Sequence, residues 1–180
     1  MPGTTRRLQA IMFTDVKGYS AMMAEDEART IRLVAEHRDL VRESLARHGG
    51  EELRTIGDAF LVVFDSALHA TQCALEIQDQ MLARNRALPP AEQLVLRIGL
   101  HVGDVVTEAD GEIAGEAVNL AARVEPLAPP GGICLTDAVA AQVRSRIDRP
   151  MTPMPPVALK NIVHPPALFR IVVAPVPVPP

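Results

Sequence analysis

Two aspartates stand where apolar, strand-like segments end in turns: Asp15 lies three residues before Gly18, and Asp58 directly follows Gly57. Two ionised carboxylates about 4 Å apart repel each other by roughly 1 to 4 kcal/mol, depending on the effective dielectric constant. A fold that brings both aspartates together at neutral pH therefore favours a cation between them. Both offer hard oxygen ligands without a neighbouring Cys or His, which favours Mg²⁺ or Mn²⁺ over zinc. Taken singly, each has a simpler explanation: a helix cap for Asp15 and a turn residue for Asp58.

A second group of residues is suited to binding phosphate and sugar oxygens. Gly18 and Tyr19 lie at a strand-to-helix junction, where backbone N–H groups and the helix N-terminus favour an anion such as a triphosphate. Asn119 and Arg123 are four residues apart on one predicted helix face, where they could hold a sugar oxygen and a phosphate oxygen. An ordinary surface asparagine and a salt-bridged arginine would show the same spacing. Together with the two aspartates, these residues point to nucleotide chemistry.

The elements that must position these residues follow from the hydrophobic pattern. A strand is predicted at 8–13, followed by a long helix that ends at the glycines of 49–50 and has one apolar face. The residues of that face are Ile31, Val34, Val41 and Leu45. Strands at 51–56 and 59–64 flank Gly57-Asp58, a pair suited to a tight hairpin turn. A second helix capped within 65–66 and a strand at 94–106 complete the order β-α-β-β-α-β.

This order of elements predicts an α+β fold, the ferredoxin-like βαββαβ sandwich. In that topology the first and third strands are antiparallel neighbours, so the end of the first lies beside the start of the third. The topology therefore brings Asp15 close to Asp58.

A C-terminal extension follows this core. It is predicted to contain a helix at 115–125 ended by Pro126, a strand at 133–136, a helix at 137–146, and a closing hairpin of 157–162 with 167–173. The last residues, 174–180, are proline-rich and are expected to form an extended tail, because proline cannot donate ladder hydrogen bonds. With 180 residues and 48% hydrophobic content, the chain suits one compact domain at 1–173.

Composition excludes several classes of partner. The chain has 18 Lys plus Arg against 22 Asp plus Glu, a formal charge of −4, so it lacks the basic surplus of a nucleic-acid-binding face. The N-terminal apolar run is too short for a signal core or a membrane span. Cys73 and Cys134 each lie in an apolar run, as is typical of buried thiols in a reducing compartment. We therefore expect a cytoplasmic protein without membrane or nucleic-acid partners.

Five motifs, in order and over nearly the whole chain, resemble the class III nucleotidyl cyclase catalytic domain. They are Phe13-Thr14-Asp15-Val16-Lys17-Gly18-Tyr19-Ser20, Arg54-Thr55-Ile56-Gly57-Asp58-Ala59-Phe60, Arg97-Ile98-Gly99-Leu100-His101-Val102-Gly103-Asp104-Val105, Gly115-Glu116-Ala117-Val118-Asn119-Leu120-Ala121-Ala122-Arg123 and Leu159-Lys160-Asn161-Ile162. The resemblance implies a ferredoxin-like core and a head-to-tail homodimer in which each active site is shared between subunits.

The resemblance also implies a ligand set and a reaction. Asp15 and Asp58 match the two metal-binding aspartates, with the backbone carbonyl of Val16 as a further ligand, for two Mg²⁺ or Mn²⁺ per active site. The ribose 3′-oxygen would attack the α-phosphorus in line, giving a 3′,5′-cyclic nucleotide and pyrophosphate. One metal would lower the pKa of the 3′-hydroxyl while the other neutralises the triphosphate.

The opposite subunit would complete each site. Asn119 matches the residue that orients the ribose, and Arg123 matches the one that stabilises charge on the α-phosphate in the transition state. Lys160 matches the lysine that binds the triphosphate.

The two base-reading positions differ from the usual family residues. Adenylyl cyclases usually have Lys and then Asp (Thr in some), whereas this chain has Arg54 and Glu112. The charge order is retained, so Arg54 could donate to adenine N1 and Glu112 accept from N6, which favours ATP. Arg54 could equally approach guanine O6 while Glu112 accepts from N1 and N2, although typical guanylyl cyclases have Glu first and a small residue second. The two could also pair with each other and obstruct the base, leaving a weakly active cyclase or a binding module without turnover.

Overall fold

The computed structural model describes residues 3–173, so the tail predicted at 174–180 lies outside the described residues. Its elements begin with a ferredoxin-like order and continue into an extension. In chain order they are β1 Thr5–Val16, α1 Tyr19–Glu25, α2 Glu27–His48, β2 Glu51–Ile56, β3 Ala59–Phe64, α3 Ala67–Arg86, η1 Pro90–Glu92, β4 Leu96–Thr107, β5 Ile113–Ala114, α4 Glu116–Val124, η2 Glu125–Leu127, β6 Ile133–Thr136, α5 Asp137–Val143, β7 Thr152–Pro153 and β8 Leu168–Ile171.

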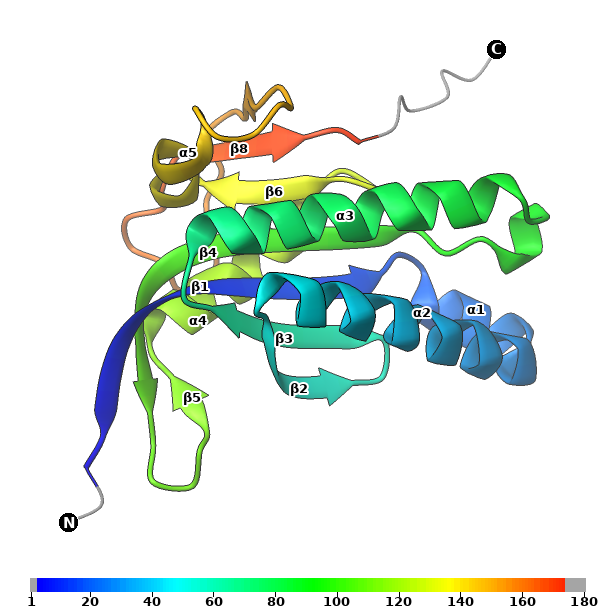
Figure 1. Ribbon diagram of the computed structural model, residues 1–180, viewed down its shortest axis with the longest axis horizontal. Helices are drawn as coiled ribbons and strands as arrows, with labels where there is room; N and C mark the ends of the chain where they lie inside the picture. The colour runs from blue at the N-terminus through cyan, green and yellow to red at the C-terminus, as the bar shows by residue number, and fades with distance from the viewer. Residues whose placement is uncertain (1–2, 174–180) are drawn as a thin grey trace.

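One mixed sheet organises the described chain, in the strand order β2-β3-β1-β4-β6-β8-β7, with the short β5 paired to the end of β4 (Figure 1). The first four strands of that order, β2-β3-β1-β4, are those of the ferredoxin-like sandwich, and β1 is antiparallel to both β3 and β4. The α+β fold with a C-terminal extension is therefore confirmed. β6 joins β4 in parallel and starts the extension.

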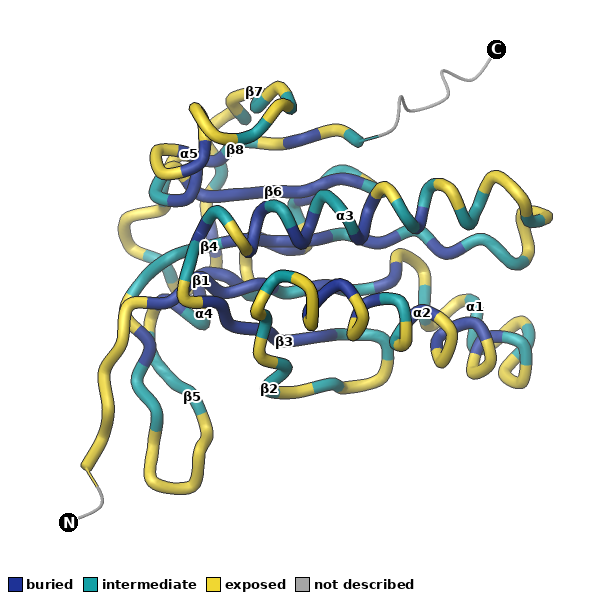
Figure 2. The backbone as a smooth tube through the Cα atoms, viewed as in Figure 1, coloured by how far each residue is buried: buried dark blue, intermediate teal, exposed yellow. Residues whose placement is uncertain are grey.

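The two faces of the sheet carry different helices, as the period-2 alternation of strand side chains requires. Met12 and Val62 belong to the main core, which α2, α3 and α5 cover. Their neighbours Ile11 and Val63 point to the opposite face, where they pack with Ala117 and the rest of α4. Figure 1 shows α2 and α3 in front of the sheet and α4 behind it, and Figure 2 shows the buried strands between these layers. The face covered by α4 also carries the site described below.

Helix α2 has clear start and stop signals. Asp26 caps it by accepting a hydrogen bond from the Arg29 backbone at 2.9 Å, and Gly49 ends it in the left-handed conformation with φ 71°. One residue of the predicted apolar face is misplaced: Ile31 is 56% exposed. The buried stripe instead includes Thr30 and Leu33. The polar Thr30 can be buried because its hydroxyl donates a hydrogen bond to the Asp26 carbonyl at 2.8 Å.

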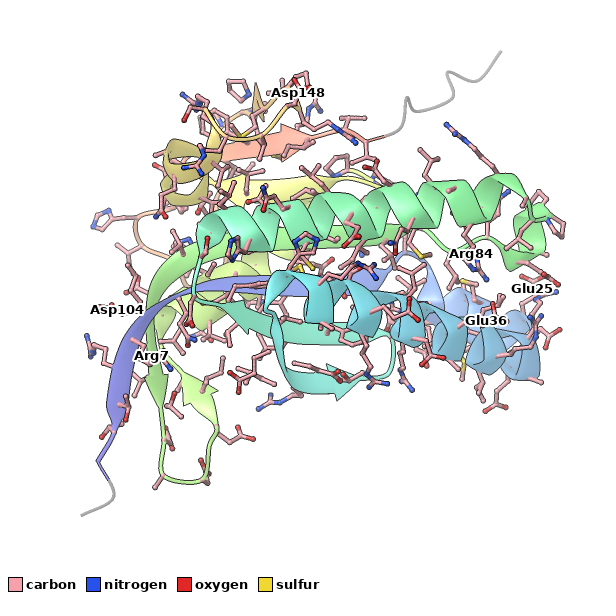
Figure 3. The ribbon with its side chains drawn as sticks, in the orientation of Figure 1. Arg7, Glu25, Glu36, Arg84, Asp104 and Asp148 are labelled. Atoms are coloured by element: carbon pink, nitrogen blue, oxygen red, sulfur yellow. The ribbon has the colours of Figure 1, made fainter. Side chains whose placement is uncertain are left out.

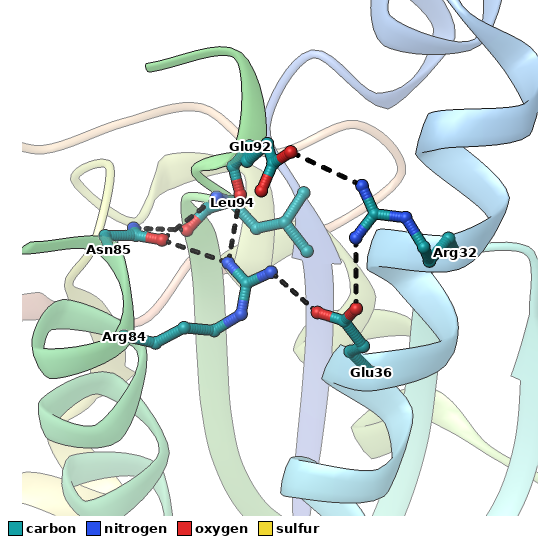
Figure 4. A network of polar contacts seen from close by, with 6 residues as sticks. All are labelled: Arg32, Glu36, Arg84, Asn85, Glu92 and Leu94. Atoms are coloured by element: carbon teal, nitrogen blue, oxygen red, sulfur yellow. Dashed lines mark hydrogen bonds and ion pairs between the residues drawn. The ribbon is translucent and has the colours of Figure 1, made fainter. Parts of the chain in front are cut away.

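A polar network joins α2 to the end of α3 (Figure 4). Glu36 accepts from Arg84 at 3.0 Å and from Arg32 at 3.2 Å, and Arg84 also donates to the Glu92 carbonyl at 3.0 Å. Exposed ion pairs contribute only about 0 to 1 kcal/mol each, so this network mainly sets the position of the loop that leads into β4.

The N-terminal half of β1 and the β4–β5 hairpin extend beyond the body of the sheet, and we call these segments the arm (Figure 1). Figure 3 shows Arg7 and Asp104 on this arm. Its side chains are largely exposed, including Leu8 at 66%. The arm therefore exposes the large apolar side chain of Leu8 outside the core.

The predicted closing hairpin is wrong. β8 pairs with β6 and with the two-residue β7, whereas residues 157–162 form no strand. Prolines at 155, 156, 165 and 166 flank this segment and lack N–H donors, so it cannot sustain a ladder. Leu159 is instead buried in a small cluster with Val124 of α4. Helix α5 also ends earlier than predicted, at Val143.

Both cysteines are free and buried in the structure, as predicted. Burial raises the pKa of the Cys73 and Cys134 thiols to about 12. Among the described helices, none combines the length and the apolar character that crossing a membrane requires.

His37 of α2 is fully buried, with its ring edge-on to Phe60 at a centroid distance of 5.7 Å. Within residues 3–173 neither ring nitrogen has a hydrogen-bond partner. Burial lowers the pKa of His37 to about 4, and the charges of Arg38 and Arg84 add to this effect. The folded protein therefore holds His37 neutral at pH values where the unfolded chain protonates it.

This difference predicts a pH-dependent loss of stability. The unfolded chain binds the proton near pH 6.5 and the folded chain only near 4, so the His37 contribution is retained above 6.5 and lost as the pH falls toward 4. Between pH 7.5 and 4.5 the loss is about 2 to 3 kcal/mol. Urea denaturation at both pH values should show that His37→Leu loses this much less stability on acidification than the unsubstituted protein. The exposed His164→Leu is the matched control, and equal acid sensitivity of His37→Leu and the parent would contradict the prediction.

Candidate functional site

Asp15 and Asp58 meet at one end of the sheet. Asp15 is the second-last residue of β1, and Asp58 lies in the turn between β2 and β3. The backbone N–H of Val16 donates to Asp58 Oδ2 at 2.6 Å. The Asp58 carboxylate therefore lies beside Val16, the residue that follows Asp15. Gly57 adopts φ 58°, a conformation that favours glycine, and its carbonyl accepts a hydrogen bond from Arg38. The turn that carries Asp58 is thus held from both sides.

The simpler explanation for Asp15 does not apply. Helix α1 begins after Gly18, and no side chain caps it. The electrostatics of the pair also differ from those of two surface carboxylates. Burial raises the pKa of Asp58, and the charge of Asp15 raises it further, while the hydrogen bond from Val16 lowers it. A cation between the two carboxylates would relieve this cost.

Arg97 is a site residue that the sequence reasoning missed. It lies directly opposite Asp15 in the β1–β4 pairing, and its Nε and Nη2 donate to Asp15 Oδ1 and Oδ2 at 3.2 and 3.0 Å. Both side chains are about three-quarters buried, with exposed fractions of 27% and 24%. The hydrogen bonds to Asp15 raise the pKa of Arg97. The register of the two antiparallel strands would have revealed this pair, because Arg97 opens one of the motifs.

Glu125 of η2 is the second missed residue. It is 8% exposed, and its Oε1 lies 3.7 Å from Arg97 Nε. Burial raises the pKa of Glu125 to about 9, and Asp15 reinforces the shift. Gly99 makes room for it: a Cβ there would lie 2.5 Å from the Glu125 backbone N and Cα. Its signal in the sequence is a glutamate that follows Arg123 by two residues and ends the helix.

The donor set at this end of the sheet fits Mg²⁺ or Mn²⁺. Asp15, Asp58 and the Val16 carbonyl are hard oxygen donors, and Arg97 already stands beside Asp15 as a positive charge. Across residues 3–173 the structure has no cluster of three or more His, Cys, Asp or Glu arranged to hold a metal ion. A cation here would therefore depend on two carboxylates and on oxygens from outside these side chains.

A cavity of about 240 Å³ lies on the α4 face of the sheet. Its walls include the apolar side chains of Phe13, Leu61 and Val118, and Arg54 and Asn119 contribute polar groups. Apolar walls with a few polar groups suit a flat aromatic ligand. Arg54 Nη2 also pairs with Glu112 Oε2 at 2.7 Å. The two predicted base-reading residues are thus in contact, one of the arrangements left open by the sequence.

Asn119 and Arg123 lie on the exposed side of α4. Gly115 precedes the helix with φ 125° and ψ 168°, a region that other residues rarely adopt. Lys160 is exposed in the loop between β7 and β8. In the described part of the chain, none of these three side chains contacts Asp15 or Asp58. One chain therefore carries the predicted residues as two separate groups.

The remaining predicted anion-binding residues lie near the aspartates. Gly18 is exposed and adopts φ 74° just before α1. The ring of half-buried Tyr19 lies against the turn, 3.6 Å from where a Cβ on Gly57 would be. Backbone and ring thus border the same end of the sheet as Asp58.

Residues 6–160 match the family described as the adenylate and guanylate cyclase catalytic domain. A Rhizobium meliloti (strain 1021) protein named "Putative adenylate cyclase 3" is 40% identical over 144 residues, which cover 79% of this chain and 24% of that protein. An adenylate cyclase of Streptomyces coelicolor is 30% identical over 146 residues, covering 81% of this chain and 36% of the relative. The chain thus spans well under half the length of these curated relatives.

Solved structures share the fold. The adenylate/guanylate cyclase/hydrolase from Silicibacter pomeroyi superposes with a TM-score of 0.87 and 39% identity, over 94% of this chain and 99% of that one. The adenylyl cyclase CyaB from P. aeruginosa gives a TM-score of 0.82 at 20% identity, over 96% and 97% of the two chains.

Proposed function

Because this chain belongs to the adenylate and guanylate cyclase catalytic-domain family, we propose that it converts ATP to 3′,5′-cyclic AMP and pyrophosphate. The observation that carries the proposal is the hydrogen bond of Asp58 to the backbone of Val16, beside Asp15. It brings two hard carboxylate donors together, which supports a site for a triphosphate-bound cation. The relatives named adenylate cyclase support ATP as the substrate.

Asp15 and Asp58, with the Val16 carbonyl, would hold two Mg²⁺ or Mn²⁺. When bound, these cations supply positive charge that favours ionisation of the ribose 3′-hydroxyl and neutralises the triphosphate. The backbone at Gly18 and Tyr19 would bind the phosphates through its N–H groups, aided by the helix N-terminus. This side of the site belongs to one chain.

A second copy of the chain would supply the other side, as a homodimer with shared sites. Asn119 would orient the ribose, Arg123 would stabilise charge at the α-phosphate, and Lys160 would bind the triphosphate. Their exposure, away from the aspartates of their own chain, supports this division. Leu8 and Ile56 are 66% and 65% exposed, which offers apolar surface for the second copy to cover.

The reaction follows from these positions. The ribose 3′-oxygen attacks the α-phosphorus, the bond to the β-phosphate bridging oxygen breaks, pyrophosphate leaves, and the 3′-hydroxyl proton passes to solvent. No side-chain nucleophile takes part. Arg123 acts on the charge that grows on the α-phosphate oxygens during attack, so its effect is on the barrier rather than on ground-state binding.

The Arg54–Glu112 ion pair does not prevent base binding on energetic grounds. Its side chains are 45% and 61% exposed, and such pairs contribute only about 0 to 1 kcal/mol. A base that hydrogen-bonds to both groups replaces that contact. Arg54 would donate to adenine N1 and Glu112 would accept from N6, while guanine could use the same two groups through O6 and N1.

Glu112→Ala should reduce the preference for ATP. Loss of one charged hydrogen-bond acceptor costs about 1.5 to 3 kcal/mol, or roughly 10- to 100-fold, and it removes the partner of the adenine amino group. The ratio of kcat/KM for ATP to kcat/KM for GTP is the measurement. Glu108→Ala, in the same exposed loop, is the control. An unchanged ratio would show that Glu112 does not discriminate between the two bases, and an unchanged kcat/KM for both nucleotides would remove it from base recognition.

The proposal is tested with purified protein, Mn²⁺ and either ATP or GTP, with products separated by chromatography and Asp58→Asn as the inactive control. Cyclic AMP as the main product supports the proposal. Formation of cyclic GMP at a comparable or higher rate would replace ATP as the substrate by GTP or by both nucleotides. Binding of nucleotide with no cyclic product from either would replace the enzyme by a nucleotide-binding module.

A further inference from the structure

The buried carboxyl group of Glu125 lies next to the pair formed by Asp15 and Arg97. Arg97 engages both carboxylate oxygens of Asp15, at 3.2 and 3.0 Å, so a cation has to compete with the guanidinium for both oxygens. Glu125 Oε1 is 3.7 Å from Arg97 Nε, the nitrogen that also donates to Asp15 Oδ1. Glu125 Oε1 itself has no hydrogen-bond partner within residues 3–173.

The backbone that carries Glu125 is fixed, whereas the guanidinium can move. Glu125 packs so closely on β4 that a Cβ at Gly99 would lie 2.5 Å from its backbone. Within residues 3–173, the Arg97 guanidinium is held by its two hydrogen bonds to Asp15, and its contacts with the Pro126 carbonyl at 3.5 Å and Glu125 at 3.7 Å are longer. The guanidinium therefore contacts Asp15 and has two further acceptor oxygens within reach, on Glu125 and on the Pro126 carbonyl.

We propose that Arg97 is a resident cation that occupies Asp15 when no metal is bound, and that Glu125 is the positioning residue that receives it when Asp15 turns to a divalent cation. The inference rests on the proposed function, since it takes Asp15 and Asp58 as metal ligands. Arg97 offsets the repulsion between the two carboxylates in the empty site. A metal ion must displace it, so Arg97 lowers the metal affinity of the nucleotide-free protein.

The competition depends on the geometry of arginine as well as on its charge. A guanidinium contacts both carboxylate oxygens at once, whereas a lysine ammonium is a single point charge that leaves one oxygen free. Arg97→Lys therefore separates competition for the oxygens from a general effect of positive charge.

Mn²⁺ binding to the nucleotide-free protein at constant pH, followed by the electron paramagnetic resonance signal of free Mn²⁺, tests the proposal. Arg97→Gln should bind Mn²⁺ about tenfold or more tightly than the parent, the effect of losing a charged hydrogen-bonded competitor. Arg97→Lys should also bind several-fold more tightly, although the charge is kept. Lys17→Gln, an exposed position beside Val16, controls for loss of a nearby charge.

Glu125 is tested by a double-mutant cycle. Glu125→Leu should weaken Mn²⁺ binding several-fold when Arg97 is present, because the displaced guanidinium loses its second acceptor. Glu125→Leu should have no effect on Mn²⁺ binding in an Arg97→Gln background, because no guanidinium is then present for Glu125 to accept from. Glu125→Gln keeps an acceptor oxygen and should restore most of the affinity. Thermal unfolding of each variant checks that the fold is retained.

The outcomes separate this inference from the proposed function. If Asp58→Asn abolishes Mn²⁺ binding but Arg97→Lys matches the parent, the metal site stands and the resident-cation proposal is overturned. Equal effects of Glu125→Leu with and without Arg97 overturn the role of Glu125. If neither the parent nor any variant binds Mn²⁺, even with a non-hydrolysable triphosphate analogue present, the assignment of Asp15 and Asp58 as metal ligands in the proposed function is overturned as well.

Discussion

Asp58→Asn is expected to lower kcat for cyclic AMP formation by about 100-fold or more. The substitution keeps the side-chain volume and an oxygen that can accept from the Val16 N–H, but it removes a negative charge that the cations need. Loss of a single preorganised electrostatic contact typically costs about 10²- to 10³-fold in kcat. The measurement is the initial rate at saturating ATP and Mn²⁺.

Asp65→Asn is the matched control. Asp65 is exposed, and its ion pair within residues 3–173 is a 3.5 Å surface contact with Arg7, so this variant should keep the parent rate. Urea denaturation should show that both variants remain folded. Loss of such a contact typically costs far more than about threefold. A rate for Asp58→Asn within about threefold of the parent rate at every Mn²⁺ concentration would therefore contradict the role assigned to Asp58.

Mixing Asp58→Asn with Arg123→Ala is expected to restore activity that neither variant shows alone. Arg123→Ala removes the charge that stabilises the transition state, a loss of about 10²- to 10³-fold. In a mixed dimer, one shared site has both defects and the other has none. Half of the dimers are mixed at equal concentrations, so about a quarter of the parent activity should return in a symmetric homodimer.

The arrangement of the substitutions provides the control. A chain that carries both Asp58→Asn and Arg123→Ala, mixed with Asp58→Asn alone, has no intact site in any dimer and should stay inactive. Analytical ultracentrifugation should show that the chains associate in each mixture. If mixed dimers form and no activity returns, the sites are not shared between chains.

Local patterns in the chain were enough to place most elements. Strands β2, β3 and β6 have the predicted bounds, because short strand-like runs between glycine and polar turns define them without reference to the rest of the fold. The stop at Gly49 and the turn at Gly57 follow from conformations that favour glycine. The order of those elements then implied that β1 and β3 are neighbours, which brought Asp15 and Asp58 into one region.

Contacts between distant segments depended on the folded structure. The pairing of Arg97 with Asp15 requires the register between β1 and β4, and a shift of one residue would have placed the arginine on the other face. The burial of Glu125 requires the close packing of η2 on Gly99. The prolines around 157–162 were visible in the sequence, but only the pairing of β8 with β6 and β7 replaced the hairpin expected there. Periodicity and turn chemistry act over a few residues, whereas register and burial are properties of segments that meet only when the chain has folded.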